Sequence, residues 1–115
     1  MERQMATLPP ELTRFAGQAA EAVAVLKSIA HEGRLLVLCY LSEAGELSVG
    51  ELVGRIGLSQ SALSQHLAKL RAEGLVATRK SAQTVYYRIA DPRMLSLLAT
   101  LHDLYCPDLG RTGTD

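Results

Sequence analysis

The stretch from Ser59 to Gly74, SQSALSQHLAKLRAEG, constrains the fold more than any other part of the chain. Leu63, Leu67 and Leu70 recur at helical spacing, which predicts a helix with one apolar stripe facing a core. The opposite stripe is small and polar, carries no acid, and consists of Ser61, Ser64, Gln65 and Ala68. The single acid of this stretch, Glu73, comes in its last turn. This pattern indicates a helix whose outer face can approach a polyanion closely.

A second helix is predicted just before this stretch. Ser48 and Glu51 form a capping-box pattern, in which the Ser48 hydroxyl accepts from a free backbone N–H and Glu51 reaches back. Gly57 and Leu58 then give a tight turn, and Ser59 is a good N-cap for the next helix. Two short helices joined in this way form a helix-turn-helix, whose second helix enters the major groove of DNA. A helical hairpin with no role in DNA binding has the same spacing, and that alternative stays open.

Two β-prone runs, LVATRK and TVYYRI, follow Gly74 and are separated by residues 81–83, SAQ. Both runs are rich in β-branched and aromatic residues, which predicts a β-hairpin. Alternation along the second run directs one face to the core and leaves the other for solvent or phosphate. A hairpin directly after a recognition helix, with Arg79 and Lys80 near its tip, is a wing.

Three further helical stretches are predicted from the apolar spacing and from helix-starting and helix-ending residues. Helical spacing runs from Glu11 to about Ala30 and is rich in alanine, so this stretch is expected to pack partly against a second subunit. Arg34 opens a short, very apolar helix that Gly45 closes, which indicates central burial. Asp91, followed by a proline, begins a last helix that Pro107 stops just after Cys106.

The expected fold is therefore mainly α with a β-hairpin wing: a winged helix-turn-helix in the order α-α-α-α-α-β-β-α. A chain of 115 residues is long enough for one domain, but it is small enough that a partner subunit would help to bury its apolar surface. We assign residues 11–107 to a DNA-binding and dimerisation domain. Residues 1–10 and 108–115 are expected to be flexible.

Charge is balanced overall and uneven along the chain. Twelve basic and twelve acidic residues cancel, which excludes a simple polybasic tail as the means of binding nucleic acid. Between Ser59 and Ile89, however, five basic residues accompany the single acid Glu73; they are Lys69, Arg71, Arg79, Lys80 and Arg88. The remainder is net acidic, so the basic surface is expected to coincide with the recognition helix and the wing.

No apolar run approaches the roughly 20 residues that a membrane span needs, and the N-terminal stretch lacks the apolar core of a signal peptide. We expect a cytoplasmic protein with no membrane partner. Cys39 and Cys106 are the two cysteines of the chain. A reducing compartment disfavours a structural disulfide between them. The two thiols are then either buried small apolar groups or sensors.

Three strings together resemble the ArsR/SmtB family of bacterial winged-helix repressors: LKSIAHEGRLLVLCYL, LSQSALSQHLAKLRAEGLV and VYYRI. The resemblance covers about Leu26 to Pro107. It implies a homodimer, with the first and last helices at its interface, that binds an inverted-repeat operator in double-stranded DNA and leaves it when an inducer arrives. Glu32 stands where the family often has proline. Residues 81–83 lack the usual wing glycine, so the wing tip is expected to be shaped differently.

On this basis we expect a transcriptional repressor and not an enzyme. Polar residues of the recognition helix are expected to reach base edges or phosphates: Gln60, Ser61, Ser64, Gln65 and His66. Basic residues are expected to contact mostly backbone phosphate: Lys69, Arg79, Lys80 and Arg88. His66 either packs within the protein or contacts DNA. The two recognition helices of a dimer would meet half-sites about 10 to 10.5 bp apart.

The sequence offers no obvious metal site. Metal sensors of this family commonly carry Cys-x-Cys in the helix that here reads LVLCYL, where this chain has Cys39 alone. Others carry Asp-x-His in the last helix, where this chain has His102 beside Asp103. A tetrahedral zinc site needs about four converging ligands. We therefore expect no metal and no cofactor, and we expect His31 and His102 to be structural or solvent-exposed.

Cys39 in the central helix and Cys106 at the end of the last helix, with SAQ in the wing, resemble the BigR/SqrR branch of the family, which responds to persulfides. The resemblance implies that the two thiols react, become bridged within one subunit and so lower operator affinity. A direct disulfide needs Cα atoms about 4.4 to 6.8 Å apart, whereas a bridge with extra sulfurs spans farther. Taken alone, Cys39 has the ordinary interpretation of a buried apolar thiol.

Two alternative interpretations of the sequence remain open. The first is a metal- or metalloid-responsive repressor that uses Cys39, Cys106 and nearby His or Asp side chains. The second is a thiol enzyme. No Cys-x-x-Cys, nucleophile elbow or glycine-rich phosphate loop in the sequence supports the enzyme.

Overall fold

The computed structural model describes residues 9–106. Most of the two ends predicted to be flexible, and Pro107, lie outside this range. In chain order the elements are α2 (Pro10–Gly17), α3 (Ala19–Ile29), α4 (Glu32–Ala44), β1 (Leu47–Ser48), α5 (Val49–Ile56), α6 (Gln60–Ala72), β2 (Val76–Ser81), β3 (Thr84–Ile89) and α7 (Pro92–Tyr105). The predicted order of helices and hairpin is confirmed. No helix between residues 9 and 106 is long and apolar enough to cross a membrane.

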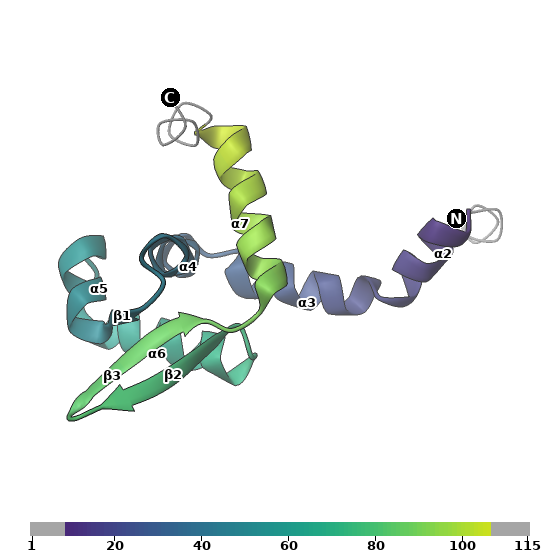
Figure 1. Ribbon diagram of the computed structural model, residues 1–115. Coiled ribbons are helices and arrows are strands. Elements are labelled where there is room, and N and C mark those ends of the chain that lie inside the picture. The colour runs from purple at the N-terminus through teal and green to yellow at the C-terminus, as the bar shows by residue number, and fades with distance from the viewer. Residues whose placement is uncertain (1–8, 107–115) are drawn as a thin grey trace.

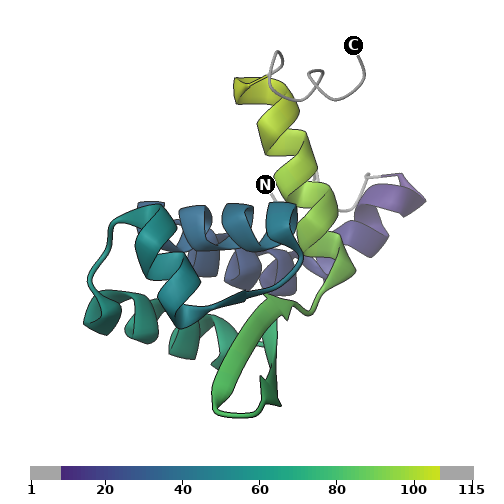
Figure 2. The same cartoon turned by 60° about the vertical axis from the view of Figure 1, so that its left-hand side comes forward.

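Helix α4 lies at the centre of the molecule (Figures 1 and 2), in contact with α3, α5, α6, α7 and β3. The hairpin of β2 and β3 projects from one end of the body, and α7 extends from the opposite end. Helices α2 and α3 reach away from the body as an arm, and α2 packs mainly against α3. The predicted recognition helix, α6, lies beside the hairpin.

The helix-turn-helix forms as its capping residues predict. Ser48 Oγ accepts a hydrogen bond from the Glu51 N–H at 3.2 Å, and Glu51 Oε1 accepts one from the Ser48 N–H at 2.9 Å. Gly57 ends α5 at φ 85°, a left-handed conformation that glycine adopts without a Cβ clash. Ser59 Oγ then accepts from the Ala62 N–H at 3.1 Å and starts α6. These local bonds fix the turn between the two helices.

The wing is a three-stranded antiparallel sheet in the order β1-β3-β2. Strands β2 and β3 pair from Val76 opposite Ile89 to Ser81 opposite Thr84, as the hairpin pattern predicts. Strand β1, which pairs Leu47 with Tyr87, was not predicted because two residues are too few to show a strand period. At the tip, Ala82 takes φ 56°, a left-handed conformation that is uncommon for a residue other than glycine.

The core is built around α4 and α6. The recognition-helix leucines Leu63, Leu67 and Leu70 are fully buried, which confirms the predicted inner stripe. Helix α4 is buried along one side through Val37, Leu38 and Leu41. The remaining buried apolar side chains are Ile29, Leu47, Leu52, Leu75, Val76, Met94 and Leu98. The core thus holds α6 against α4 and leaves the polar face of α6 outward.

Two predicted boundaries were wrong. The stretch from Glu11 to Ala30 is broken at Gln18, where a poor helix former, Gly17, ends α2. Helix α4 begins at Glu32, two residues before the predicted start. Its N-cap is His31, whose Nδ1 accepts a hydrogen bond from the Gly33 N–H at 3.0 Å. A histidine in this role carries no clear sequence signal, because Ser, Thr, Asp and Asn are the usual N-caps.

Candidate nucleic-acid interface and cysteine pair

The outer face of α6 is exposed and free of acid in its first turn. Four of the predicted DNA-contacting side chains are solvent-exposed: Gln60, Ser61, Ser64 and Gln65. Three buried leucines on the other side of the helix fix their orientation. A rigid helix with short polar side chains outward matches the shape and chemistry of the major groove.

His66 is placed differently from these four residues. Its side chain is half-buried, and its ring lies 4.6 Å from the ring of His31, between centroids. Burial lowers the pKa of His66, and the charges of His31 and Arg34 lower it further. A Cβ atom added at Gly33 would come within 2.9 Å of His66 Nε2. The structure therefore places the His66 side chain against the start of α4.

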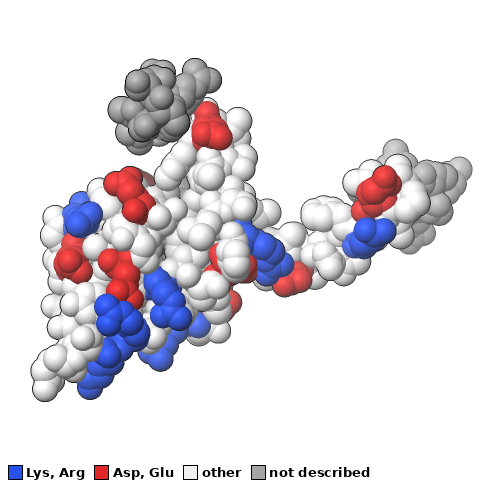
Figure 3. All heavy atoms as spheres, viewed as in Figure 1, with Lys and Arg blue, Asp and Glu red and all other residues white. Residues whose placement is uncertain are grey.

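Basic side chains gather along the hairpin edge of the molecule, whereas acidic groups lie farther up over α4, α5 and α7 (Figure 3). Lys80 and Arg88 are exposed and take part in no salt bridge within the described part of the chain. Arg79 donates two hydrogen bonds to Glu46, at 2.7 and 2.8 Å, and its guanidinium lies 4.7 Å from the centre of the Tyr86 ring. The described wing therefore presents two cations outside any salt bridge, Lys80 and Arg88, and one, Arg79, that is already paired.

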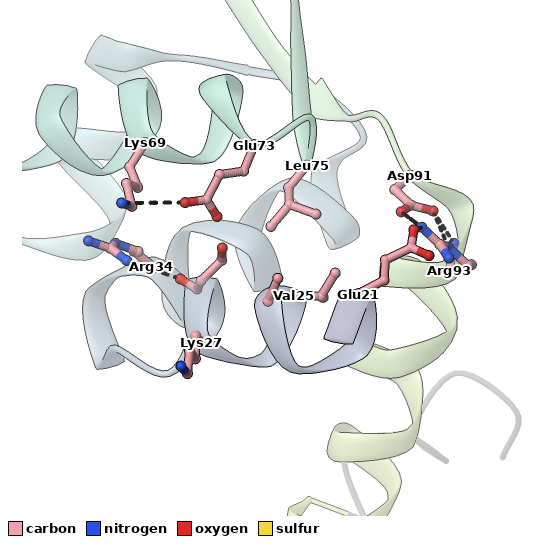
Figure 4. Close-up of a pocket in the computed structure, with 11 residues that line it drawn as sticks. Glu21, Val25, Lys27, Arg34, Lys69, Glu73, Leu75, Asp91 and Arg93 are labelled. Atoms are coloured by element: carbon pink, nitrogen blue, oxygen red, sulfur yellow. Dashed lines mark hydrogen bonds and ion pairs between the residues drawn. The ribbon is translucent and has the colours of Figure 1, made fainter. Parts of the chain in front are cut away.

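Lys69 lies apart from the wing cations. Its Nζ atom is 3.4 Å from Glu73 Oε2, and both side chains line an open hollow of about 720 Å³ bounded by α3, α4, α6 and the start of α7. Figure 4 shows Lys69 directed toward Arg34, which donates to the Ser28 carbonyl at 3.2 Å. Neither cysteine lines this hollow. The predicted phosphate contact of Lys69 requires it to leave Glu73.

The two predicted sensing residues both carry free thiols. Cys39 lies in α4 and is half-buried, whereas Cys106 is the exposed C-cap of α7. Burial raises the pKa of the Cys39 thiol, and negative charge on Cys106 raises it further. The two thiols are 67 positions apart in the sequence, and the helices that carry them, α4 and α7, contact each other.

The sequence analysis expected His102 to be structural or solvent-exposed and did not connect it with Cys39. The structure places its Nε2 atom 3.4 Å from Cys39 Sγ, in a half-buried contact between α7 and α4. His102 also accepts the Cys106 N–H at its backbone oxygen, at 2.7 Å. The available signal was the spacing of His102 and Cys106 by four residues, which puts them on one side of a helix. Cys39, His102 and Cys106 are called the thiol site below.

No group of three or more His, Cys, Asp and Glu side chains within residues 9–106 is arranged to hold a metal ion. The helix-turn-helix, the exposed polar face of α6 and the basic wing instead define a winged-helix DNA-binding protein. Comparisons with known proteins identify the family. Residues 31–78 match the model described as "Bacterial regulatory protein, arsR family".

The chain is 52% identical over 98 residues to the transcriptional activator HlyU of Vibrio cholerae, covering 85% of this chain and 90% of that protein. The solved structure of reduced HlyU from Vibrio cholerae has a TM-score of 0.75 at 53% identity and covers 81% of this chain and 97% of that one. The repressor BigR from Xylella fastidiosa has a TM-score of 0.78 at 37% identity, covering 82% and 95%. The chain belongs to the ArsR family and is a DNA-binding transcriptional regulator.

Proposed function

We propose that this regulator is a homodimeric repressor that leaves its operator when persulfides join Cys39 to Cys106 within one subunit. The observation that carries the proposal is that His102 links two free thiols on different helices: its ring lies 3.4 Å from Cys39 Sγ, and its backbone oxygen accepts the Cys106 N–H. Likeness to the repressor BigR supports the same assignment. The proposal includes a second subunit and an inverted-repeat operator, as the sequence resemblance implies.

The bridging reaction needs no oxidant other than the persulfide. A small persulfide, R–S–SH, transfers its outer sulfur to the exposed Cys106 thiolate and leaves as the thiol RSH. The Cys39 thiolate then attacks the sulfur atom that bears the terminal SH group. The new S–S bond forms, the bond to the terminal sulfur breaks, and that sulfur departs as hydrosulfide with the electron pair. One added sulfur on Cys106 yields a disulfide, and two yield a trisulfide.

The position of α4 explains how such a bridge reaches the DNA. Helix α4 contacts α6 and α7 directly, so a covalent link between Cys39 and Cys106 ties the end of α7 to the helix that supports the recognition helix. Leu104 and Tyr105, beside Cys106, are 68% and 80% exposed and are available to a second copy of the chain. The bridge changes DNA affinity only by favouring one arrangement of the dimer over another.

The arm supplies the other apolar surface for dimerisation. Phe15 in α2 is 57% exposed and Leu26 in α3 is 51% exposed, although both are large apolar side chains. In the proposed dimer they pack against the partner subunit. Phe15→Glu is expected to shift the protein toward monomer in sedimentation equilibrium, whereas an unchanged dimer would remove α2 from the interface.

In the proposed DNA complex, four polar side chains of α6 meet base edges or phosphates: Gln60, Ser61, Ser64 and Gln65. Two exposed basic side chains of the wing bind backbone phosphate, Lys80 and Arg88. Arg79 and Lys69 join them after exchanging Glu46 and Glu73 for phosphate. His66 stays packed on His31 and supports the helix from behind.

Single serine variants test the proposal. An operator duplex, selected by the reduced protein from a random-sequence library, is titrated with wild type, Cys39→Ser and Cys106→Ser, before and after glutathione persulfide. Both variants are expected to bind the duplex as reduced wild type does and to stay bound after persulfide. Release of either variant by persulfide would overturn the bridge. Zinc and arsenite are tested in parallel, and release at stoichiometric metal that requires Cys39 would favour the metal-responsive alternative.

A further inference from the structure

The proposed bridging reaction requires a proton acceptor beside Cys39. Cys39 has to lose its proton before it can attack sulfur, since the thiolate and not the thiol is the nucleophile. Burial and the nearby Cys106 both raise the pKa of Cys39, so neither assists this step. A nucleophile in such surroundings needs an adjacent base.

We infer that His102 accepts the proton of Cys39 and returns it to the hydrosulfide that leaves during bridging. The geometry carries the inference: His102 Nε2 lies 3.4 Å from Cys39 Sγ, within reach of a sulfur hydrogen bond. In the tautomer with its proton on Nδ1, Nε2 is free to accept from the thiol. This inference rests on the proposed function, because it assigns a role within the same site.

With His102 as the proton acceptor, all protons and electrons of the bridging reaction are accounted for. Cys39–SH gives its proton to Nε2, and the thiolate attacks the sulfur chain on Cys106. The terminal sulfur leaves with the electron pair of the broken bond. It then takes the proton from His102 and departs as H₂S, so that the imidazole is neutral at both the start and the end. Histidine suits this task because it exchanges a proton near neutral pH.

His102 contacts both cysteines, Cys106 through its backbone and Cys39 through its ring. It lies one helical turn before Cys106, and its carbonyl oxygen accepts the Cys106 N–H at 2.7 Å. Its ring meanwhile faces Cys39 on α4. His102 and Cys106 are the titratable groups, among residues 9–106, for which the structure gives an interaction with Cys39. The pH response of Cys39 should therefore depend on these two side chains.

Alkylation of Cys39 by iodoacetamide tests the inference without any persulfide. The reaction is followed across a pH series in a Cys106→Ser background, where Cys39 is the single thiol. Adding His102→Gln is expected to slow alkylation near neutral pH by about tenfold. A positioned base contributes roughly 10²–10⁴-fold to the rate of a reaction, so this expectation is conservative. The pH profile should also move to higher pH. Equal rates and an unchanged profile would overturn the inference.

Asp103→Asn in the same background is the matched control, since Asp103 is an exposed neighbour on α7, and its alkylation profile should not move. Far-ultraviolet circular dichroism and DNA binding by the reduced protein check the fold of each variant. A second measurement, thiolate absorbance against pH, reports the ionisation of Cys39 directly and is expected to show the same upward displacement in His102→Gln.

A persulfide experiment on the two-cysteine chain separates this inference from the proposed function. If His102→Gln slows alkylation but persulfide forms no bridge in the parent protein, the proton acceptor stands and the proposed function fails. If the parent forms the bridge and His102→Gln forms it equally fast with an unchanged alkylation profile, the proposed function stands and the proton acceptor fails. Slower bridging and slower alkylation together support both.

Discussion

The guanidinium of Arg79 is held by the carboxylate of Glu46 through two hydrogen bonds, at 2.7 and 2.8 Å. Arg79 lies on the wing and Glu46 on the turn before β1, so this pair joins the wing to the body. In the proposed DNA complex the same pair would compete with DNA, because a phosphate would need the guanidinium that Glu46 already holds. Hydrogen bonding from Arg79 also keeps the pKa of Glu46 below its usual range.

Glu46→Gln is therefore expected to strengthen DNA binding. Removing the carboxylate charge leaves Arg79 free for a phosphate, so affinity should rise a few-fold and the dependence of log K on log salt should steepen by up to about one unit. Fluorescence anisotropy of a labelled duplex over a salt series measures both. Glu43→Gln, at an exposed acid of α4, is the control. Equal affinity of the two variants would show that the Arg79 pair does not limit binding.

Lys80→Ala tests the free cation of the wing. Lys80 is exposed and unpaired in residues 9–106, so its loss should weaken binding to specific and unrelated duplexes alike. The salt slope should become shallower by about one unit, as expected for one lost phosphate contact. The control is Lys27→Ala, because Lys27 lies on α3 and lines the hollow away from the wing; this variant should leave the salt slope unchanged. Unaltered binding by Lys80→Ala would take the wing tip out of the interface.

The recognition helix and the wing were predictable because their signals are local. Three leucines at helical spacing, a capping box and a two-strand alternation each need only a short window of sequence. The break at Gln18 and the His31 cap were missed because they depend on weak preferences rather than on a periodic pattern. The contact between His102 and Cys39 was missed for another reason: it joins residues 63 positions apart, and only packing of α7 on α4 brings them together.

Gly33→Ala should destabilise the fold although alanine is the better helix former. The added Cβ would lie 2.9 Å from His66 Nε2 and 3.3 Å from His31 Cε1, so the two tilted rings would have to move away from α4. We expect a loss of about 1 kcal/mol or more in the free energy of unfolding, in the range typical of overpacking. Urea denaturation measures it.

Gly54→Ala is the matched substitution for that experiment, because a Cβ at Gly54 in α5 meets no atom within 4 Å. It should stabilise the protein by roughly 0.5–1 kcal/mol through helix propensity. Stabilisation by both substitutions would mean that the His31 and His66 rings tolerate displacement without cost.

Mild acid should also act through His66. Its folded pKa lies below the ordinary histidine value, so the unfolded chain binds more protons between the two values. Above the ordinary histidine pKa, His66 does not lower the free energy of unfolding. As the pH drops toward the folded pKa, protonation of His66 in the unfolded chain lowers the free energy of unfolding. Denaturation curves for wild type and His66→Gln, taken from slightly alkaline to mildly acidic pH, should differ in slope. Parallel pH dependences would exclude His66 as the source.

The most direct test of the proposed mechanism measures the reaction of the two cysteines and the release of DNA in the same sample. Reduced wild-type protein bound to its selected duplex is treated with glutathione persulfide, and the free fraction is analysed by intact mass and peptide mapping. We predict release of DNA in step with an intrasubunit crosslink between Cys39 and Cys106, with peroxide less effective. Release without that crosslink, or full crosslinking with DNA still bound, would contradict the account.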